Sequence, residues 1–275
     1  MALTKVIGAG LGAVTQDGAA TFNEGSADVD FRIESNGNTH GIFLDGGNEK
    51  VGIFTSNPND YYADDLVLTA ADEGGITIKG GTGHANFVAF ADGTSGNAAY
   101  RGFLNYDHAI DSLYLGVAGE SHFTINSAHI LTMDKQPAFN AKGSSTPTLA
   151  INTYYTLPID TEIFDQNADY NTSNYTFTAP VTGRYQLNGS VYFYNYLDSS
   201  AGYMILIIKT SNREYQKIIT ATMFGSDIAN YSMNISTLAD MDANDTAYLN
   251  VYQQGGAAQT TISGGNTHFT GYLVA

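Results

Sequence analysis

The feature that most constrains the fold of this chain is a period-2 alternation of large apolar and polar residues on both sides of a short break. Tyr175, Phe177 and Ala179 alternate with threonines, which is the pattern of a strand with one buried face. The alternation resumes at Tyr185, Leu187, Gly189, Val191 and Phe193. Pro180 ends the pairing of the first strand because it has no N–H group, and Gly183 supplies a turn position at which a positive φ is expected. The segment 164–193 is therefore predicted to hold two strands around a sharp turn.

The same segment resembles the signature of the globular head of complement component one-q. The matching positions are Phe164-Asp165, Tyr170 and Phe177-Thr178-Ala179-Pro180-Val181-x-Gly183-x-Tyr185. The family's opening strand has a match at Ala138-Phe139-Asn140-Ala141, and its closing strand at Phe269-Thr270-Gly271-Tyr272-Leu273. The resemblance covers residues 138–275 and implies a ten-stranded jelly roll of the tumour-necrosis-factor type that assembles as trimers. The family consists of recognition modules, so the resemblance implies binding rather than chemistry and leaves the ligand open.

The first half of the chain has a different pattern, made of very short strand-like segments between turn signals. Two such segments carry alternating apolar residues at Phe31, Ile33, Ile42 and Leu44. Asn36-Gly37 and Gly46-Gly47 mark the turns that follow them. Strands of about five residues cannot bury a core alone. We therefore expect residues 28–137 to need partner chains, either intertwined or packed about a threefold axis.

Short motifs in this half resemble repeats of bacteriophage tail fibres and related virion proteins. They are Phe31-Arg32-Ile33-Glu34-Ser35, Leu44-Asp45, Asn48-x-x-Val51-Gly52-Ile53 and Tyr100-Arg101-Gly102-x-Leu104-x-Tyr106-Asp107. The resemblance implies a trimeric shaft that continues into a trimeric head, so that both halves share one symmetry. The expected architecture is all-β and trimeric, with a short-stranded shaft followed by a jelly-roll sandwich. The expected parts are a virion-attachment segment at residues 1–27, the shaft at 28–137 and the head at 138–275.

Composition supports a β-rich chain and excludes some functions. The chain has 19 Tyr, 14 Phe and 30 Gly, which favours strands and turns, and it has no Cys, so no disulfide framework is possible. Its net charge of −16 argues against binding to a nucleic-acid backbone, which needs clustered Lys and Arg. The longest apolar run, residues 203–208, is too short to span a bilayer and is interpreted as a buried strand. The N-terminus has too short an apolar segment for a secretion signal.

No residue pattern predicts catalysis or a firm metal site. Asp240-x-Asp242-x-Asn244 resembles the start of a calcium loop, but the positions that need Gly and Glu hold Asp245 and Val251. A turn before the strand that contains Tyr248 is the better interpretation. Calcium near a threefold axis, which occurs in some members of the head family, is possible but has no motif here. The carboxylate pairs Asp64-Asp65 and Asp72-Glu73 are expected in solvated loops, and no nucleophile motif is present. We therefore predict a protein that is not an enzyme and needs no cofactor.

The candidate binding residues are tyrosines of the predicted jelly roll. Tyr192, Tyr194 and Tyr196 alternate along one strand, so one of its faces is aromatic. This pattern is explained by sheet packing, or alternatively by an aromatic patch that stacks on sugar rings or a protein receptor. Segment 195–202 is predicted to be an exposed, variable loop, so Asn195 and Asp198 join the three tyrosines as tentative receptor contacts.

The function that best fits these patterns is a homotrimeric, non-enzymatic phage virion fibre. Its N-terminus would attach to a tail or capsid protein, and its head would bind a host surface glycan or protein. It would be assembled in the host cytoplasm, without nucleic-acid binding or membrane insertion. A second hypothesis is a capsid head fibre or decoration protein with a structural role. A third is a polysaccharide-degrading spike, which this length disfavours because such enzymes usually carry a long parallel β-helix.

Overall fold

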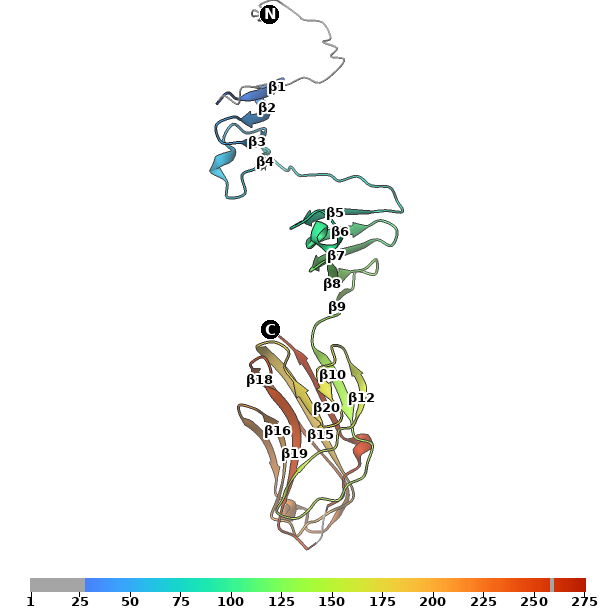
Figure 1. Cartoon of the computed structure of the whole chain (residues 1–275). Coiled ribbons are helices and arrows are strands. Elements are labelled where there is room, and N and C mark those ends of the chain that lie inside the picture. The colour runs from blue at the N-terminus through green and yellow to red at the C-terminus, as the bar shows by residue number, and fades with distance from the viewer. Residues whose placement is uncertain (1–27, 258–259) are drawn as a thin grey trace, which may run out of the picture. The chain divides into compact units, whose positions relative to one another are not determined.

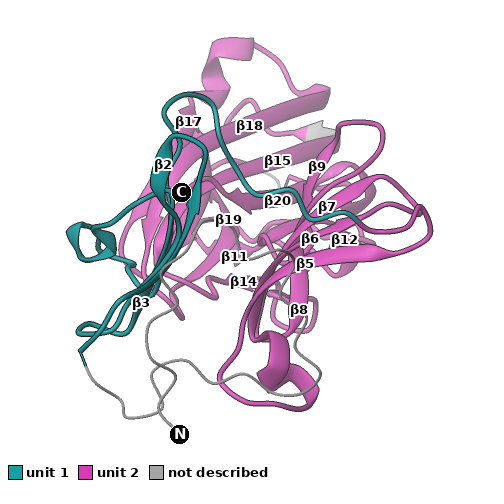
Figure 2. Ribbon diagram, turned by 90° about the horizontal axis from the view of Figure 1, so that it is seen from above, with its two compact units in different colours: residues 1–79 teal, residues 80–275 magenta. Residues whose placement is uncertain are grey.

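The protein is all-β throughout the part that the structure describes. The structure is a computed structural model that describes residues 28–257 and 260–275. Every regular element there is a β-strand or a short 3-10 helix, which confirms the predicted fold class. The expected attachment segment, residues 1–27, lies outside the described residues. The chain divides into two compact units, the first ending at Lys79 and the second beginning at Gly80 (Figure 2).

The first unit is built on a four-stranded sheet with the order β1-β2-β3-β4 (Figure 1). Its elements are β1 (Phe31–Ser35), β2 (Asn38–Asp45), β3 (Lys50–Ile53), the 3-10 helix η1 (Pro58–Asp60) and β4 (Leu66–Leu68). Asn36 and Gly37 form the two-residue turn between β1 and β2, and the φ of +100° at Gly37 is one that this turn favours. Phe43 and Val67 are buried on one side of the sheet, together with Pro58 of η1.

The second unit begins with a five-stranded antiparallel meander, in the order β5-β6-β7-β8-β9. Its elements are β5 (Ala85–Phe90), η2 (Gly96–Tyr100), β6 (Gly102–Asp107), β7 (Ser112–Val117), β8 (Glu120–Ile125) and β9 (Leu131–Met133). Phe103 is the main buried side chain, and its ring makes edge contacts with Phe87 and Tyr100 at centroid distances of 5.8 and 6.1 Å. Short strands between turns were predicted for this region.

Residues from Ala138 onward form a jelly-roll sandwich of two sheets (Figure 1). The β10 sheet has the order β12-β10-β20-β15-β18, with β10 (Ala138–Lys142), β12 (Thr161–Asp165), β15 (Gly183–Leu197), β18 (Ile228–Met241) and β20 (His268–Leu273). The β16 sheet has the order β13-β14-β19-β16-β17, with β13 (Tyr170–Asn171), β14 (Thr176–Thr178), β16 (Tyr203–Thr210), β17 (Glu214–Ile219) and β19 (Thr246–Gln254). The short β11 (Tyr154–Thr156) also pairs with β19, and the 3-10 helices η3 (Ala221–Phe224) and η4 (Gly264–Asn266) lie in connections.

The core of the sandwich is made largely by the residues that carry the family resemblance. Phe139 of β10 stacks on Phe177 and Tyr170 at centroid distances of 4.7 and 5.0 Å, and it meets the edge of Phe269 at 5.1 Å. Tyr185 is fully buried beside Phe177. The alternating residues of β15 all lie on this side, which confirms the half-buried strand predicted for residues 185–193. The predicted buried strand at residues 203–208 is also confirmed, as part of β16.

The two strands predicted on either side of Pro180 are present, but they do not pair with each other. β14 pairs with β13 and β19, whereas β15 pairs with β18 and β20, so the chain crosses from one sheet to the other at the break. Alternation defines a strand but not its partner, so the sequence did not reveal this crossing. Gly183 does not need a positive φ either. Instead, a Cβ there would lie 2.6 Å from Leu273 Cδ1 and 2.7 Å from the Ala275 carbonyl oxygen, so the close approach of the C-terminus requires glycine.

Candidate functional site

Two of the predicted tyrosines lie together near the end of β15. Tyr192 and Tyr194 are two residues apart on one face of the strand, and their ring centroids are 6.2 Å apart. The Tyr192 hydroxyl donates a 2.6 Å hydrogen bond to Asn230 Oδ1 on the neighbouring strand β18, which fixes the orientation of its ring. Tyr194 is 41% exposed. The pair therefore offers an aromatic surface with one ring held in place and the other accessible.

The remaining predicted contacts differ from these two tyrosines. Asn195 and Tyr196 belong to β15, but their side chains lie outside the described residues. Asp198 is only 1% exposed. Its Oδ1 accepts hydrogen bonds from the Ser200 amide and hydroxyl at 2.8 and 2.5 Å, and its Oδ2 accepts one from the Ala257 amide at 2.7 Å. This carboxylate holds two loops together, and its burial weighs against direct contact with a receptor.

Segment 195–202 is less exposed than the sequence suggested. β15 continues to Leu197, and Leu197 and Ala201 are both fully buried in the core. The carboxylate of Asp227, on the segment before β18, accepts hydrogen bonds from the amide and hydroxyl of Ser199. The predicted freely varying loop is therefore a packed corner of the sandwich.

A second tyrosine cluster was missed by the sequence reasoning. Tyr154 of β11 stands opposite Tyr252 of β19, with a centroid distance of 4.7 Å, and Tyr203 of β16 lies 6.1 Å from Tyr252. Tyr154 is 57% exposed. The three residues lie far apart in sequence and meet only through strand pairing in the β16 sheet, so no local pattern could reveal them.

The outward face of the β10 sheet is polar and contains a shallow hollow of about 290 Å³. Its polar lining residues are Asn188, Ser190, Asn234, Ser236, His268 and Thr270. Ser236 Oγ donates to Asn188 Oδ1 at 2.8 Å, and Gln186 Nε2 donates to Ser236 Oγ at 2.8 Å. Asn188 Nδ2 also donates a 3.4 Å hydrogen bond to Thr270 Oγ1, so part of the polar lining forms one hydrogen-bonded group.

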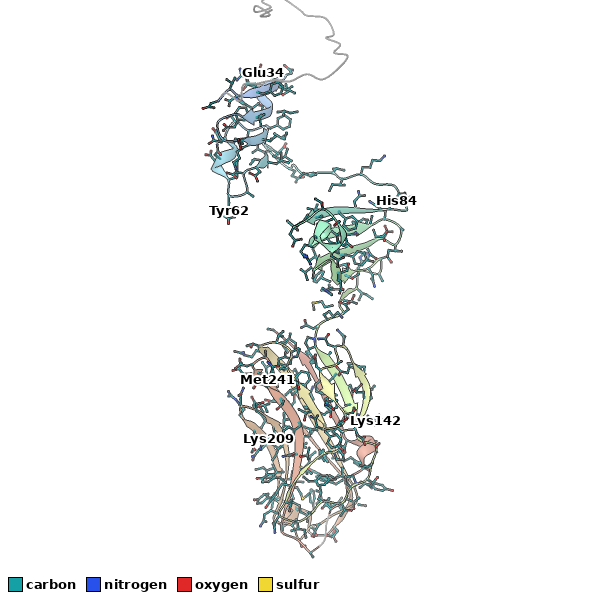
Figure 3. All side chains as sticks on the ribbon, in the orientation of Figure 1. Glu34, Tyr62, His84, Lys142, Lys209 and Met241 are labelled. Carbon is teal, nitrogen blue, oxygen red and sulfur yellow. The ribbon has the colours of Figure 1, made fainter. Side chains whose placement is uncertain are left out.

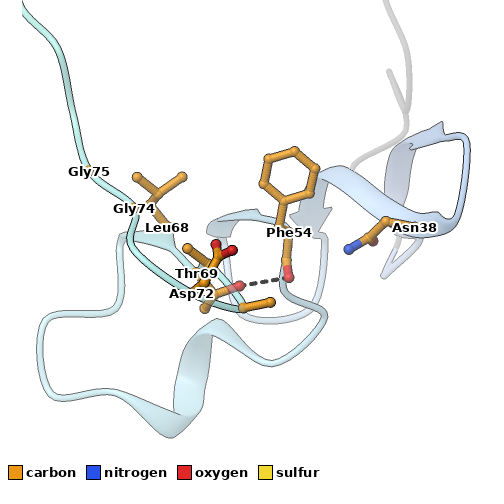
Figure 4. A pocket seen from close by; sticks show the side chains of 9 residues that line it. Asn38, Phe54, Leu68, Thr69, Asp72, Gly74 and Gly75 are labelled. Atoms are coloured by element: carbon orange, nitrogen blue, oxygen red, sulfur yellow. Dashed lines mark hydrogen bonds between the residues drawn. The ribbon is translucent and has the colours of Figure 1, made fainter.

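Another hollow, of about 570 Å³, lies in the first unit (Figure 4). Phe54 and Leu68 flank it, and the Thr69 hydroxyl donates a 2.7 Å hydrogen bond to the Phe54 carbonyl oxygen. Phe54 adopts a φ of +57°. Asp72 is the only ionisable residue in its lining. The hollow is an open, mainly apolar concavity rather than a site for acid–base chemistry.

Charged groups within the described residues form ion pairs, and no cluster of them could hold a metal ion. Lys209 and Glu214, on β16 and β17, are 3.0 Å apart, and Lys209 is labelled in Figure 3. The Glu214 carboxylate raises the pKa of Lys209, and Lys209 in turn lowers the pKa of Glu214. No group of three or more His, Asp or Glu residues in the described part could hold a metal ion. Asp242 and Asp245 lie in the turn between β18 and β19, where Asp245 Oδ2 accepts the Asp242 amide, which confirms the predicted turn.

Comparisons with known proteins give one family match and several distant structural neighbours. Residues 138–274 match the family described as the C1q domain. The globular domain of zebrafish complement 1qA is 15% identical, with 51% of this chain and 98% of that chain covered and a TM-score of 0.40. Murine APRIL is 12% identical, with 51% and 100% covered and a TM-score of 0.38. No curated protein matches the chain.

The C-terminal half of the chain is thus a C1q-type jelly-roll domain. C1q and tumour-necrosis-factor-like domains are non-enzymatic binding domains and are often trimeric. In the described part, no helix is long and apolar enough to cross a membrane.

Proposed function

We propose that this chain, whose residues 138–274 form a C1q domain, is the protomer of a homotrimeric bacteriophage virion fibre. The C1q domain is the tip and binds a glycan or protein of the host surface. Residues 28–137 are the shaft, and the N-terminus attaches to a tail or capsid protein. The protein works by binding alone, without a cofactor, and it is assembled in the host cytoplasm.

The observation that carries the binding role is the C1q domain itself. Its sandwich closes an extensive apolar core within one chain, so its strands act as a scaffold and its outer surface is free for recognition. Tyr192 and Tyr194 lie on that surface, and a tyrosine ring combines an apolar face with a polar hydroxyl. This combination suits both sugar rings and protein surfaces.

The virion role is supported by the region before the C1q domain. Residues 28–137 carry the motifs that resemble phage fibre repeats, and there they form two small sheets of short strands rather than a globular domain. A stem of short-stranded sheets that carries a binding domain is the composition that a fibre needs.

Adsorption of the purified full chain to host cells tests the receptor role. We expect Tyr194→Ala to weaken binding at least about tenfold, which corresponds to roughly 1.4 kcal/mol. The matched control is Tyr154→Ala, since Tyr154 is also an exposed tyrosine but belongs to the β16 sheet. If both variants bind host cells as well as the unsubstituted chain does, Tyr194 does not contact the receptor. Absence of competition between the chain and whole phage would reject the receptor role.

The alternative is a capsid head fibre or decoration protein with a structural role. Labelling of intact particles with an antibody against the C1q domain distinguishes the two, because the label marks either the tail or the capsid. An unlabelled particle would argue against both virion roles.

A further inference from the structure

One face of the first sheet is apolar from edge to edge. Strand pairing places Phe31, Leu44, Val51 and Leu66 in one row across β1–β4, and Ile33, Ile42, Ile53 and Leu68 in the next. Directly paired residues lie on the same face of a sheet, so these eight residues form one surface, here named the first apolar face. Six of the eight are between 38% and 64% exposed.

The opposite face of this sheet contains the buried residues of the unit. Phe43 and Val67 are buried there, together with Pro58 of η1. Arg32 and Glu34 also lie on that side of β1 and form a 3.1 Å ion pair; Glu34 is labelled in Figure 3. One side of the sheet thus holds the buried residues and the ion pair, whereas six residues of the first apolar face are at least 38% exposed.

The β5–β9 sheet repeats this arrangement independently. One row across it is Val88, Leu104, Leu115, Phe123 and Met133, and a neighbouring row on the same face is Tyr106, Leu113, Ile125 and Leu131. These nine residues are named the second apolar face. Val88, Leu104, Leu115 and Met133 are each 40–46% exposed. Phe103 and Asn105 are buried on the other side, next to η2.

We propose, resting on the homotrimer proposed above, that each apolar face packs against the same face of two further copies of this chain. Residues 31–68 and 85–133 then fold as two separate three-copy cores. Contiguous apolar patches beyond a few hundred Å² are uncommon on monomeric proteins. The seventeen residues of the two faces approach the roughly 20–30 residues a side of a standard interface.

Charge points to another copy of this chain as the occupant. The chain carries a net charge of −16, so contacts between copies must avoid carboxylates. The residues that define the two apolar faces include no Asp, Glu, Lys or Arg. Such residues lie on the opposite side of β1 and in the turns, where Asp111 Oδ1 accepts a 3.1 Å hydrogen bond from the Tyr106 hydroxyl of the second apolar face. The C1q domain that follows belongs to a family that is often trimeric, and a shared threefold symmetry lets both halves assemble without mismatch.

The test introduces a lysine on one or the other face of the same sheet in the full-length chain. Ile33→Lys places a charge in the first apolar face, and its neighbour Glu34→Lys places one on the opposite face as the control. Leu104→Lys does the same for the second apolar face, with Thr132→Lys as its control on the other side. Native mass spectrometry over a dilution series gives the stoichiometry, and hydrogen exchange reports each region separately.

We expect the unsubstituted chain and both controls to be trimers. Ile33→Lys should speed exchange at least tenfold within residues 31–68, and Leu104→Lys within residues 85–133, while amides of the jelly-roll core stay protected. The double variant should raise the concentration at which trimers dissociate at least 100-fold. Protection of the jelly-roll core shows that the variants have not simply failed to fold.

A monomeric unsubstituted chain at micromolar concentration would overturn the proposal, as would equal behaviour of test and control variants. If the trimer persists unchanged in the double variant while the chain still adsorbs to host cells, the interface assignment fails and the proposed function stands. If the faces prove necessary for the trimer but the chain does not adsorb, the receptor role fails alone.

Discussion

At the scale of single residues, the signature of the C1q domain consists of core residues. Phe139, Tyr170, Phe177 and Phe269 contact one another in one aromatic cluster, although they span most of the domain's sequence. The Tyr170 hydroxyl donates a 2.8 Å hydrogen bond to the Ile159 carbonyl oxygen, and burial raises the pKa of this hydroxyl well above its usual value. Residues that identify the fold are therefore distinct from those that could select a ligand.

Gly271 of β20 is a residue whose substitution tests this packing. A Cβ there would lie 2.7 Å from Phe139 Cε1 and 2.7 Å from Leu187 Cδ2, both in the core. We expect Gly271→Ala to lower the free energy of unfolding by about 1–3 kcal/mol, because an overpacked core must shift its side chains. The measurement is the chemical denaturation midpoint of the C1q domain. Gly265→Ala, at a site with no atom within 4 Å, is the control and should change stability by less than about 0.5 kcal/mol.

At the scale of elements, β15 organises the jelly roll. Its fifteen residues pair with β18 on one side and β20 on the other, so it lies inside the β10 sheet. Its first residues follow the crossing between sheets, where the Tyr185 hydroxyl donates to the Val181 carbonyl oxygen at 2.8 Å. Its last residues lead into the turn in which the Asp198 carboxylate accepts hydrogen bonds from the Ser200 and Ala257 amides. The tyrosine pair is thus carried on the most constrained strand of the domain.

The corner after β15 depends on the buried carboxylate of Asp198. We expect Asp198→Ala to destabilise the domain by about 2–4 kcal/mol, because the Ser200 and Ala257 amides lose a charged acceptor. Hydrogen exchange at these two amides should accelerate more than exchange in β16. The control is Asp227→Ala in the same corner, whose carboxylate is exposed and should cost about 1 kcal/mol or less. Equal losses from the two variants would show that burial of Asp198 is not decisive.

At the scale of the whole molecule, the two halves differ in how completely they bury apolar surface. The C1q domain closes its core within one chain. The two sheets of residues 31–133 each cover one face and expose the other. The exposed apolar surface of the first half is the physical basis for the proposal that copies of the chain associate there.

The charge of the assembled molecule leads to a salt prediction. Copies that each carry a net charge of −16 repel one another, and salt screens that repulsion while leaving apolar contacts intact. We expect the Tm of the full chain to rise by several degrees between about 20 mM and 500 mM NaCl. Calorimetry in NaCl and in KCl at matched concentrations separates screening from binding of a specific ion. A Tm that falls with salt would indicate that ion pairs, rather than apolar faces, hold the assembly.

Much of the fold could be predicted from local patterns, but the partners of the strands could not. Alternation correctly located β15, the apolar run at residues 203–208 located β16, and Asn36-Gly37 marked the turn between β1 and β2. The two strands around Pro180 were predicted, but their membership of different sheets was not, because it depends on distant strands. The loop expected at residues 195–202 is only partly exposed, because polar Asp198 is buried by hydrogen bonds that no sequence pattern signals. A receptor role for Tyr192 and Tyr194 stays a prediction.

The sequence alone determined that this chain is rich in β-strands, because side-chain alternation is a local property, and the resemblance of its core residues to the C1q family implied a jelly roll in its second half. Only the tertiary structure decided which side chains share a surface. The rows of the two apolar faces and the Tyr154–Tyr252 pair depend on strand register between residues distant in sequence. A shift of one residue in register would move each side chain to the other face of its sheet, so these surfaces exist only once the strands have paired.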